Sequence, residues 1–268
     1  MARGSARAVR PVPEGYVSFR VGRARLAARP DVADAVRRAI ESAGSLYAYA
    51  ARHPGAGLLA GRGPAYTVPS PAGRWVVRHY RRGGAVARGL GDRYLRLGVP
   101  RPFRELVASE AVRRLGIDTP AVLAAAVYPA GLFYRGDLVT LEIPGSADLA
   151  AVLFGPAALE GEARLEACAA AGALVRRLGE RGVVHADLHA KNLLLDPSVR
   201  PPRVYVLDLD RCRVARGPVP GAARRMARRL ARSLAVWERR TGRRLSAAER
   251  AALLPAFAGA RPAGGAGG

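Results

Sequence analysis

The sequence predicts an α+β fold of two lobes, a small β-rich N-terminal lobe and a mainly helical C-terminal lobe. β-prone runs next to glycine and proline turns occur at residues 61–68, 74–80, 121–128 and 137–143, and long helical patterns occupy residues 157–181 and 221–240. Between these helices, residues 183–195 show a buried strand, a polar loop and a second buried strand. With 268 residues, 50% of them hydrophobic, the chain is long enough for a proper core in one or two lobes.

The charge balance favours polyanionic partners such as nucleic acid, anionic lipid or a phosphorylated glycan, because the formal net charge is +23. Of the 44 lysines and arginines, only Lys191 is a lysine, and abundant arginine, alanine, glycine and proline are also typical of GC-rich coding bias. The positive charge can therefore be explained either by a functional basic surface or by a bias in amino-acid composition, and both explanations are kept. Cys168 and Cys212 have no metal-ligand spacing and predict reduced thiols in a cytosolic protein.

No targeting or membrane segment is expected. The arginines of residues 1–13 precede no apolar stretch of the secretory type. The longest apolar run, residues 121–133, is interrupted by Pro129 and is shorter than the roughly 20 residues that span a bilayer. We therefore expect a soluble or peripheral protein, with a disordered Gly/Ala-rich tail at residues 259–268.

Residues 1–45 form a predicted tail and N-terminal extension, ahead of an N-lobe at 46–143 and a C-lobe at 144–258. In the extension, the alternating residues 16–21 predict a strand. Asp31 is the predicted N-cap of a helix over residues 32–42 that ends at Gly44.

The first motif of the N-lobe is a glycine pair, Gly61 and Gly63, followed by a β-prone run through Val68. Such a hairpin lets the backbone approach nucleotide phosphates, because a Cβ would block that approach. We assign the two glycines and Val68 to the nucleotide site. A purely structural hairpin is the alternative, since Tyr66 stands where a third glycine is usual.

The strand at residues 74–80 is expected to carry a cation for those phosphates. The only lysine lies elsewhere, so Arg78, which follows two valines, is the candidate; an exposed strand arginine is the alternative. A helix over residues 102–116, with Gly116 as its C-cap, offers Glu105 or Glu110 as the partner. The first-turn position favours Glu105.

An apolar strand at residues 121–128 and a second strand at 137–143 complete the N-lobe. The second strand is stopped by Pro144 and Gly145, as expected of a hinge between lobes. Backbone groups of Leu141 and Ile143 would then bind the adenine edge of a nucleotide.

The polar loop contains His185, Asp187 and Asn192, and a later strand over residues 204–208 ends in Asp208. Phosphoryl transfer uses an Asp to orient the acceptor hydroxyl and oxygen ligands to hold Mg²⁺. We predict Asp187 as the catalytic residue, Asn192 and Asp208 as metal ligands, and His185 as a brace for the loop.

This combination predicts a protein-kinase-like fold that uses ATP and Mg²⁺. Lys191 is close enough in sequence to Asp187 to contact the transferring phosphate, and Asp210 is a candidate for a second metal. Only 12 residues separate Asp208 from Gly221, and no Ala-Pro-Glu segment follows, so a platform for an extended peptide is missing. We expect a small molecule or glycan as acceptor.

The helix over residues 221–240 carries Met226, Leu230, Leu234 and Trp237 at helical spacing, with arginines on its other faces. A C-lobe helix that packs this stripe into the core is the favoured interpretation. The alternative is an amphipathic helix that lies on an anionic membrane.

Several motifs together resemble the lipopolysaccharide core kinases, in particular the 3-deoxy-D-manno-octulosonic acid (Kdo) kinase branch. They are Val-Val-Arg-His-Tyr-Arg-Arg-Gly-Gly around Arg78, Phe-Arg-Glu ending at Glu105, the loop at 185–192, and Leu-Asp-Leu-Asp-Arg at 207–211. The resemblance implies a protein-kinase-like fold and transfer of the ATP γ-phosphate to a sugar hydroxyl of lipid-A-linked Kdo. It implies a cytoplasmic protein, peripheral at the inner face of the inner membrane.

The same resemblance supports Asp187 as catalytic residue, Asn192 and Asp208 as metal ligands, and Arg78 in place of the usual lysine with Glu105 as its partner. It implies Kdo-lipid A or a related anionic glycolipid and an anionic membrane surface as partners, since arginines pair with carboxylates and phosphates.

Three alternatives stay open. One is a kinase of another core sugar or of a small alcohol, of the aminoglycoside or choline type. Another is a pseudokinase scaffold that binds nucleotide. The third, nucleic-acid binding, rests on charge alone, and we expect no specific nucleic-acid partner because no recognition motif is present.

Overall fold

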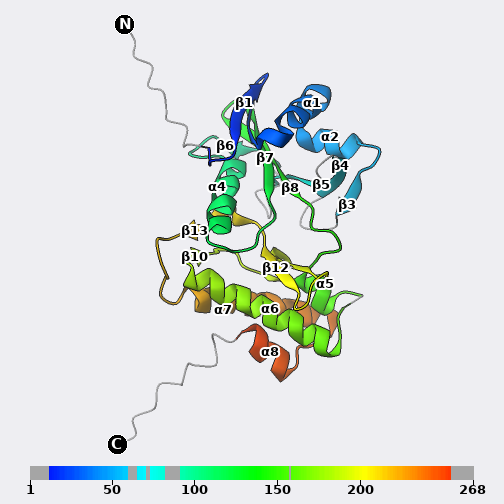
Figure 1. Ribbon diagram of the computed structural model, residues 1–268, viewed down its shortest axis with the longest axis vertical. Helices are drawn as coiled ribbons and strands as arrows, with labels where there is room; N and C mark the ends of the chain where they lie inside the picture. Colours follow the sequence, from blue (N-terminus) through cyan, green and yellow to red (C-terminus); the bar gives the residue numbers. More distant parts are fainter. Residues whose placement is uncertain (1–11, 60–64, 71–72, 82–90, 157, 255–268) are drawn as a thin grey trace, which may run out of the picture. The chain divides into compact units, whose positions relative to one another are not determined.

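The computed structural model describes residues 12–59, 65–70, 73–81, 91–156 and 158–254. The chain divides into two compact units (Figure 1). Unit 1 comprises residues 1–110 and 121–142, and unit 2 comprises residues 111–120 and 143–268. The predicted glycine pair at 61 and 63 and the predicted disordered tail at 259–268 lie outside the described residues.

Unit 1 is built on an antiparallel sheet that, in the described residues, has eight strands. The strand order is β1-β2-β7-β8-β5-β4-β3, and β6 pairs with β8. The strands are β1 (Val17–Val21), β2 (Ala24–Ala28), β3 (Gly57–Leu59), β4 (Ala65–Ser70), β5 (Gly73–His79), β6 (Tyr94–Leu95), β7 (Val122–Ala130) and β8 (Phe133–Leu141). The stretch predicted as an N-terminal extension thus supplies β1 and β2, and β2 pairs with β7.

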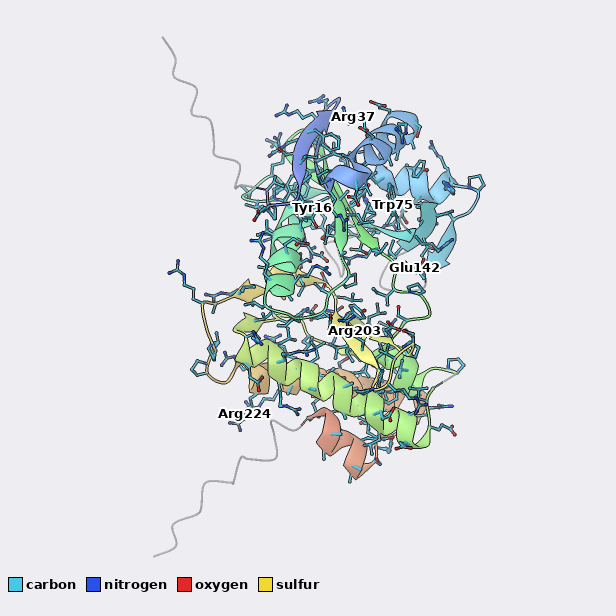
Figure 2. All side chains as sticks on the ribbon, viewed as in Figure 1. Tyr16, Arg37, Trp75, Glu142, Arg203 and Arg224 are labelled. Carbon is cyan, nitrogen blue, oxygen red and sulfur yellow. The ribbon has the colours of Figure 1, made fainter. Side chains whose placement is uncertain are left out.

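Both faces of this sheet are covered, so unit 1 has two cores. Helices α1 (Ala33–Ala43) and α2 (Leu46–Arg52) cover one face, where Trp75 and Val77 of β5 are buried (Figures 1 and 2). Leu106 of helix α4 (Arg101–Arg114) packs on the other face with residues such as Leu138. Because side chains alternate along a strand, the even-numbered residues of β5 point toward α4.

An ionic network fastens β5 to β8 on the α2 side of the sheet. His79 Nδ1 lies 2.6 Å from Asp137 Oδ1, and His79 Nε2 lies 3.1 Å from Asp92 Oδ2. The Tyr47 N–H donates to Asp137 Oδ2 at 2.9 Å. Asp137 is fully buried, so these partners offset the free-energy cost of removing its charge from water.

The helix predicted after residue 31 ends at Gly44, which adopts a left-handed φ of 79°. Its predicted N-cap is wrong. Asp31 lies within a short 3-10 helix, Pro30–Val32, and Val32 caps α1 without a side-chain hydrogen bond. Asp31 therefore sits ahead of the first turn of α1, where its carboxylate accepts a 2.8 Å hydrogen bond from Arg29 Nη2.

Unit 2 is mainly helical with short strand pairs. Its elements are β9 (Ala147–Asp148), α5 (Leu149–Phe154), α6 (Gly161–Glu180), β10 (Val183–Val184), β11 (Leu193–Asp196), β12 (Arg203–Val206), β13 (Arg213–Val214), α7 (Ala222–Thr241) and α8 (Ala247–Leu253). Strands β12, β11 and β9 form one small sheet, and β10 pairs with β13. Strands β10 and β11 flank the polar loop, in agreement with the predicted strand–loop–strand pattern.

Helix α7 is a core helix, as favoured from the sequence. Met226, Leu230 and Leu234 are buried, so its apolar stripe is not available to a membrane. The opposite face carries exposed arginines such as Arg224, which is labelled in Figure 2. Helices α6 and α7 approach closely at Gly179, where an added Cβ would lie 2.8 Å from the Ala223 Cβ. In the part of the chain that is described, none of the helices is both long and apolar enough to cross a bilayer.

Candidate active site

In unit 1, Arg78 and Glu105 form a hydrogen-bonded ion pair. Glu105 is 3% exposed, and its second carboxylate oxygen accepts a hydrogen bond from the Tyr80 hydroxyl. Arg78 and Tyr80 are two residues apart in the chain, so both face α4. A buried carboxylate is thereby neutralised on one oxygen and hydrogen-bonded on the other, which fixes the direction of the Arg78 guanidinium.

Glu110, the other candidate partner, has a different role. The Tyr16 hydroxyl oxygen lies 2.9 Å from Glu110 Oε1 and 2.5 Å from the Val122 carbonyl oxygen, and these two acceptors share its single hydrogen. Glu110 therefore connects α4 with the start of the chain, and Glu105 is the carboxylate at Arg78.

In unit 2, His185 is 1% exposed and is held by two backbone groups and by the sulfur of Met226. Its Nε2 lies 2.9 Å from the Leu207 carbonyl oxygen, and its Nδ1 accepts the Asp187 N–H at 3.1 Å. A carbonyl only accepts and an N–H only donates, so the ring carries its proton on Nε2. The His185 N–H donates to Met226 Sδ at 3.3 Å.

Burial lowers the pKa of His185 from its ordinary value, although the Leu207 carbonyl and the nearby carboxylates oppose this effect. A neutral ring with both nitrogens engaged is suited to bracing a loop. It is not suited to moving protons.

Asn192 and Asp208 lie at the same end of the β11–β12 hairpin. Leu193 pairs with Val206, and the Leu207 N–H donates to the Asn192 carbonyl oxygen at 2.9 Å. Asn192 Nδ2 donates to the Asp187 carbonyl oxygen at 2.9 Å, which leaves Oδ1 as the atom available to a cation. Asp208 has a φ of 59°, a left-handed conformation that is uncommon outside glycine.

This donor set fits Mg²⁺. The Asn192 Oδ1 and the Asp208 carboxylate are hard oxygen ligands, and Mg²⁺ is commonly held by one or two such groups together with water and phosphate oxygens. Among the described residues, no group of three or more His, Cys, Asp or Glu side chains is arranged to hold a metal. A site with few protein ligands suits a cation that arrives with a nucleotide.

Residues 50–257 match the model of the Lipopolysaccharide kinase (Kdo/WaaP) family. The chain belongs to this family.

Curated proteins similar to this family member carry the name 3-deoxy-D-manno-octulosonic acid kinase. The protein of Stenotrophomonas maltophilia (strain R551-3) is 36% identical over 178 residues, which cover 65% of this chain and 67% of that protein. The protein of Vibrio cholerae serotype O1 is 30% identical over 163 residues, which cover 60% of this chain and 66% of that protein. The chain thus spans about two thirds of the length of these relatives.

A solved structure of WaaP in complex with acyl carrier protein has a similar fold. The TM-score is 0.50 at 16% identity, over 75% of this chain and 77% of that chain. This similarity agrees with the predicted α+β, protein-kinase-like fold of the Kdo/WaaP family member described here.

The backbone groups of Leu141 and Ile143, the predicted adenine contacts, are partly engaged in hydrogen bonds within the protein. The Leu141 N–H already donates to the Ala121 carbonyl oxygen at 2.9 Å. The Ile143 carbonyl oxygen, in unit 2, accepts from Ser146 N at 3.3 Å and from Ser146 Oγ at 2.6 Å. The Leu141 N–H and the Ile143 carbonyl oxygen are therefore already engaged within their own units.

The assignment of Val68 to the nucleotide site is wrong. Val68 pairs with Trp75, and both are buried in the core beneath α1 and α2, on the face of the sheet opposite Arg78. Val68 is fully buried in this hydrophobic core, so its role is to pack the sheet against these helices.

Lys191 belongs to the polar loop, and its side chain contacts helix α7. Its Nζ is 5.4 Å from the centroid of the Trp237 ring, a cation–π contact. One residue earlier, the Ala190 N–H donates to Ser233 Oγ at 3.2 Å. Together with the contact of Met226 with His185, these contacts show that α7 supports the loop at residues 185–192.

Sequence reasoning missed Tyr80, Met226 and Ser233. Tyr80 had a usable signal, because a residue two positions after Arg78 in a strand faces the same way. Met226 and Ser233 had none, because a buried methionine and a helical serine look like ordinary packing residues until the loop that they contact is placed.

Proposed function

We propose that the chain is an ATP-dependent kinase that phosphorylates a sugar hydroxyl of lipid-A-linked Kdo, a step of lipopolysaccharide inner-core synthesis. The observation that carries the proposal is the loop in which His185 holds both the Asp187 N–H and the Leu207 carbonyl. The braced loop carries Asp187, the proposed catalytic carboxylate, and leads into the hairpin whose end carries the two proposed metal ligands. The names of the curated relatives support the choice of acceptor.

Asp187 orients the acceptor hydroxyl and accepts its proton as the bond between the sugar oxygen and the γ-phosphorus forms and the bond to the β-phosphate oxygen breaks. Its backbone is fixed on both sides, by His185 at the N–H and by Asn192 at the carbonyl oxygen. Asn192 and Asp208 hold Mg²⁺, which when bound neutralises charge on the phosphates.

The remaining contacts position the nucleotide. Arg78 is held by Glu105, whose other carboxylate oxygen accepts from the Tyr80 hydroxyl, and binds the α- and β-phosphates through its planar fork. Lys191 exchanges its contact with Trp237 for the transferring phosphate. Leu141 and Ile143 bind the adenine edge through backbone groups.

We further propose that the protein works as a peripheral protein at the cytoplasmic face of the inner membrane. The acceptor carries a carboxylate on Kdo and phosphates on lipid A, and this chain has a net charge of +23. Arginine forms bidentate pairs with both kinds of anion, so a basic surface suits this acceptor and an anionic lipid surface.

The test is transfer of labelled γ-phosphate from ATP, with Mg²⁺, to Kdo-lipid A by the full chain, beside a panel of aminoglycosides and choline. We expect label on Kdo-lipid A alone. Asp187→Asn should abolish transfer and keep Mg-ATP binding. The matched control is Asp196→Asn, at the last residue of β11, where the carboxylate accepts the Ser198 N–H.

Two outcomes would overturn the proposal. Label on a soluble alcohol but on no Kdo-containing acceptor would assign a small-molecule kinase. If the wild-type chain neither bound ATP nor transferred phosphate, a non-catalytic scaffold would be indicated.

A further inference from the structure

Unit 1 carries three exposed leucines on two neighbouring backbone segments, Leu95, Leu97 and Leu132, here called the leucine tip. Their exposed fractions are 46%, 80% and 78%. Leu95 lies in β6 opposite Phe133 of β8, and the next residue, Arg96, donates its N–H to the Leu132 carbonyl oxygen at 3.0 Å. Two segments distant in sequence are thus hydrogen-bonded where they present these leucines to solvent.

The leucine tip stands on a fixed base. Beneath it, the rings of Tyr94 and Tyr134 stack with centroids 5.6 Å apart, and both residues are buried. Arg101 donates from Nη1 to the Tyr94 hydroxyl and from its backbone N–H to the Tyr134 hydroxyl, both at 3.0 Å. The exposed leucines therefore belong to a packed hairpin edge, and binding through them would require little ordering of the chain.

The surroundings of the leucine tip are cationic. Residues 93–104 contain four arginines and no acidic residue. Arg93 and Arg96 are exposed, and Arg96 Nη1 also donates to the Gly131 carbonyl oxygen at 3.3 Å in the turn before Leu132. Arg135, further along β8, is paired with Asp92 at 3.0 Å. Exposed leucines and exposed arginines are therefore close neighbours in the chain at β6.

Scattered exposed leucines need no explanation, but a rigid group of them among arginines points to a partner that offers both hydrocarbon and negative charge. The headgroup region of an anionic bilayer offers both within a few ångströms of depth. We propose that the leucine tip inserts at the headgroup–acyl boundary of an anionic membrane while the neighbouring arginines bind lipid phosphates. The inference rests on the proposed function, since it names the surface that brings this kinase to a lipid-linked acceptor.

Vesicle flotation of the full chain, with neither ATP nor Kdo-lipid A present, tests whether the leucine tip binds the membrane. The vesicles contain equal parts of phosphatidylethanolamine and phosphatidylglycerol, and vesicles of pure phosphatidylcholine, which is zwitterionic with no net charge, serve as the comparison. Wild type should float with the anionic vesicles. Leu97→Gln combined with Leu132→Gln should weaken binding by about tenfold or more, because two apolar side chains no longer leave water. Leu58→Gln, at a 65% exposed leucine of β3, is the matched control and should bind as wild type does.

A second measurement does not depend on loss of binding. A Leu97→Trp variant should show a blue-shifted fluorescence emission on anionic vesicles, and a Leu58→Trp variant should show none. Equal binding by wild type and the double glutamine variant, or no shift for Leu97→Trp, would overturn the proposal. So would a wild-type dimer that the double variant dissociates, which would assign the leucine tip to a second copy of the chain.

Because the flotation assay measures no phosphate transfer, its failure is distinguishable from failure of the kinase proposal. If the chain phosphorylates Kdo-lipid A in detergent but does not bind vesicles, only the membrane proposal is refuted. If the chain binds vesicles in a way that depends on the leucine tip but transfers no phosphate, only the kinase proposal is refuted.

Discussion

His185 donates a hydrogen bond from Nε2 to the carbonyl oxygen of Leu207, 2.9 Å away. The N–H of the same Leu207 donates to the Asn192 carbonyl oxygen, so the backbone immediately before Asp208 is held at both its polar groups. Asp208 follows in a left-handed conformation. The histidine therefore acts on the metal-ligand candidate through the backbone, and this relationship gives the sharpest prediction.

Replacing His185 by Gln should weaken Mg²⁺ activation. The Leu207 carbonyl would lose its fixed donor, and Asp208 would no longer be held in place. Loss of a group that orients a metal ligand typically costs about 10–100-fold in metal affinity or activity. The measurement is phosphate transfer as a function of Mg²⁺ concentration, and His53→Gln, at the end of α2, is the matched control. An unchanged Mg²⁺ dependence in His185→Gln would contradict the role given to the brace.

Asp208→Asn should fold normally and lose turnover. Asparagine tolerates the left-handed backbone, but its neutral amide is a poor ligand for Mg²⁺. Asp208→Ala should lose turnover and also about 1 kcal/mol of folding free energy, because alanine is strained at this φ. Thermal unfolding and transfer assays of both variants check this. Equal stability of the two variants would show that the backbone there is not strained.

Tyr80→Phe should raise the KM for ATP by about tenfold with a smaller effect on kcat, because one hydrogen bond to the buried Glu105 carboxylate is lost. The guanidinium of Arg78 would then be less well aimed at the phosphates. Tyr66→Phe is the control, since Tyr66 lies against the core on the α1–α2 face of the same sheet. If Tyr80→Phe changed stability alone and left the KM for ATP unaltered, Tyr80 would be a packing residue.

The two glutamates of α4 should behave differently. Glu105→Gln removes the negative charge at Arg78 and should lower kcat/KM for ATP by about tenfold or more. Glu110→Gln keeps an acceptor for the Tyr16 hydroxyl and should leave kinetics unchanged. The measurement is the kcat/KM for ATP of both variants. A larger loss in Glu110→Gln than in Glu105→Gln would indicate that Glu110 is the functional partner of Arg78.

His79 should make unfolding stability depend on pH. Burial alone would lower its pKa, but the hydrogen bonds and charges of Asp137 and Asp92 outweigh burial and raise the pKa above 6.5. Its contribution is therefore fully present below the ordinary pKa and is lost as pH rises through the raised pKa. Urea unfolding of wild type and His79→Gln should show a larger stability difference at acidic than at alkaline pH. Asp92→Asn should narrow that difference, and a difference independent of pH would refute the charged network.

The sequence anticipated the pair of Arg78 with Glu105 and the strand–loop–strand around Asp187, because strand alternation and loop spacing are local properties. Val68 was misplaced for a physical reason. Both faces of the sheet in unit 1 are buried, so the apolar residues of a strand do not reveal which of its faces carries Arg78. The seven-residue helices α2 and α8 were missed because so short a segment shows too few turns for a helical period to appear. The role of Asp31 depended on Pro30, which starts a separate turn ahead of α1.

Strands β1 and β2 have a practical consequence for how this protein is handled. The match to the family begins at residue 50, yet β2 is hydrogen-bonded along β7, and Leu26 and Ala28 fill the core beneath α1 and α2. A clone trimmed to the family boundary would expose β7 as a bare sheet edge, open to pairing with other chains. The cooperative folding unit is larger than the segment that sequence similarity delimits, and expression vectors for this kinase family member should begin ahead of Tyr16.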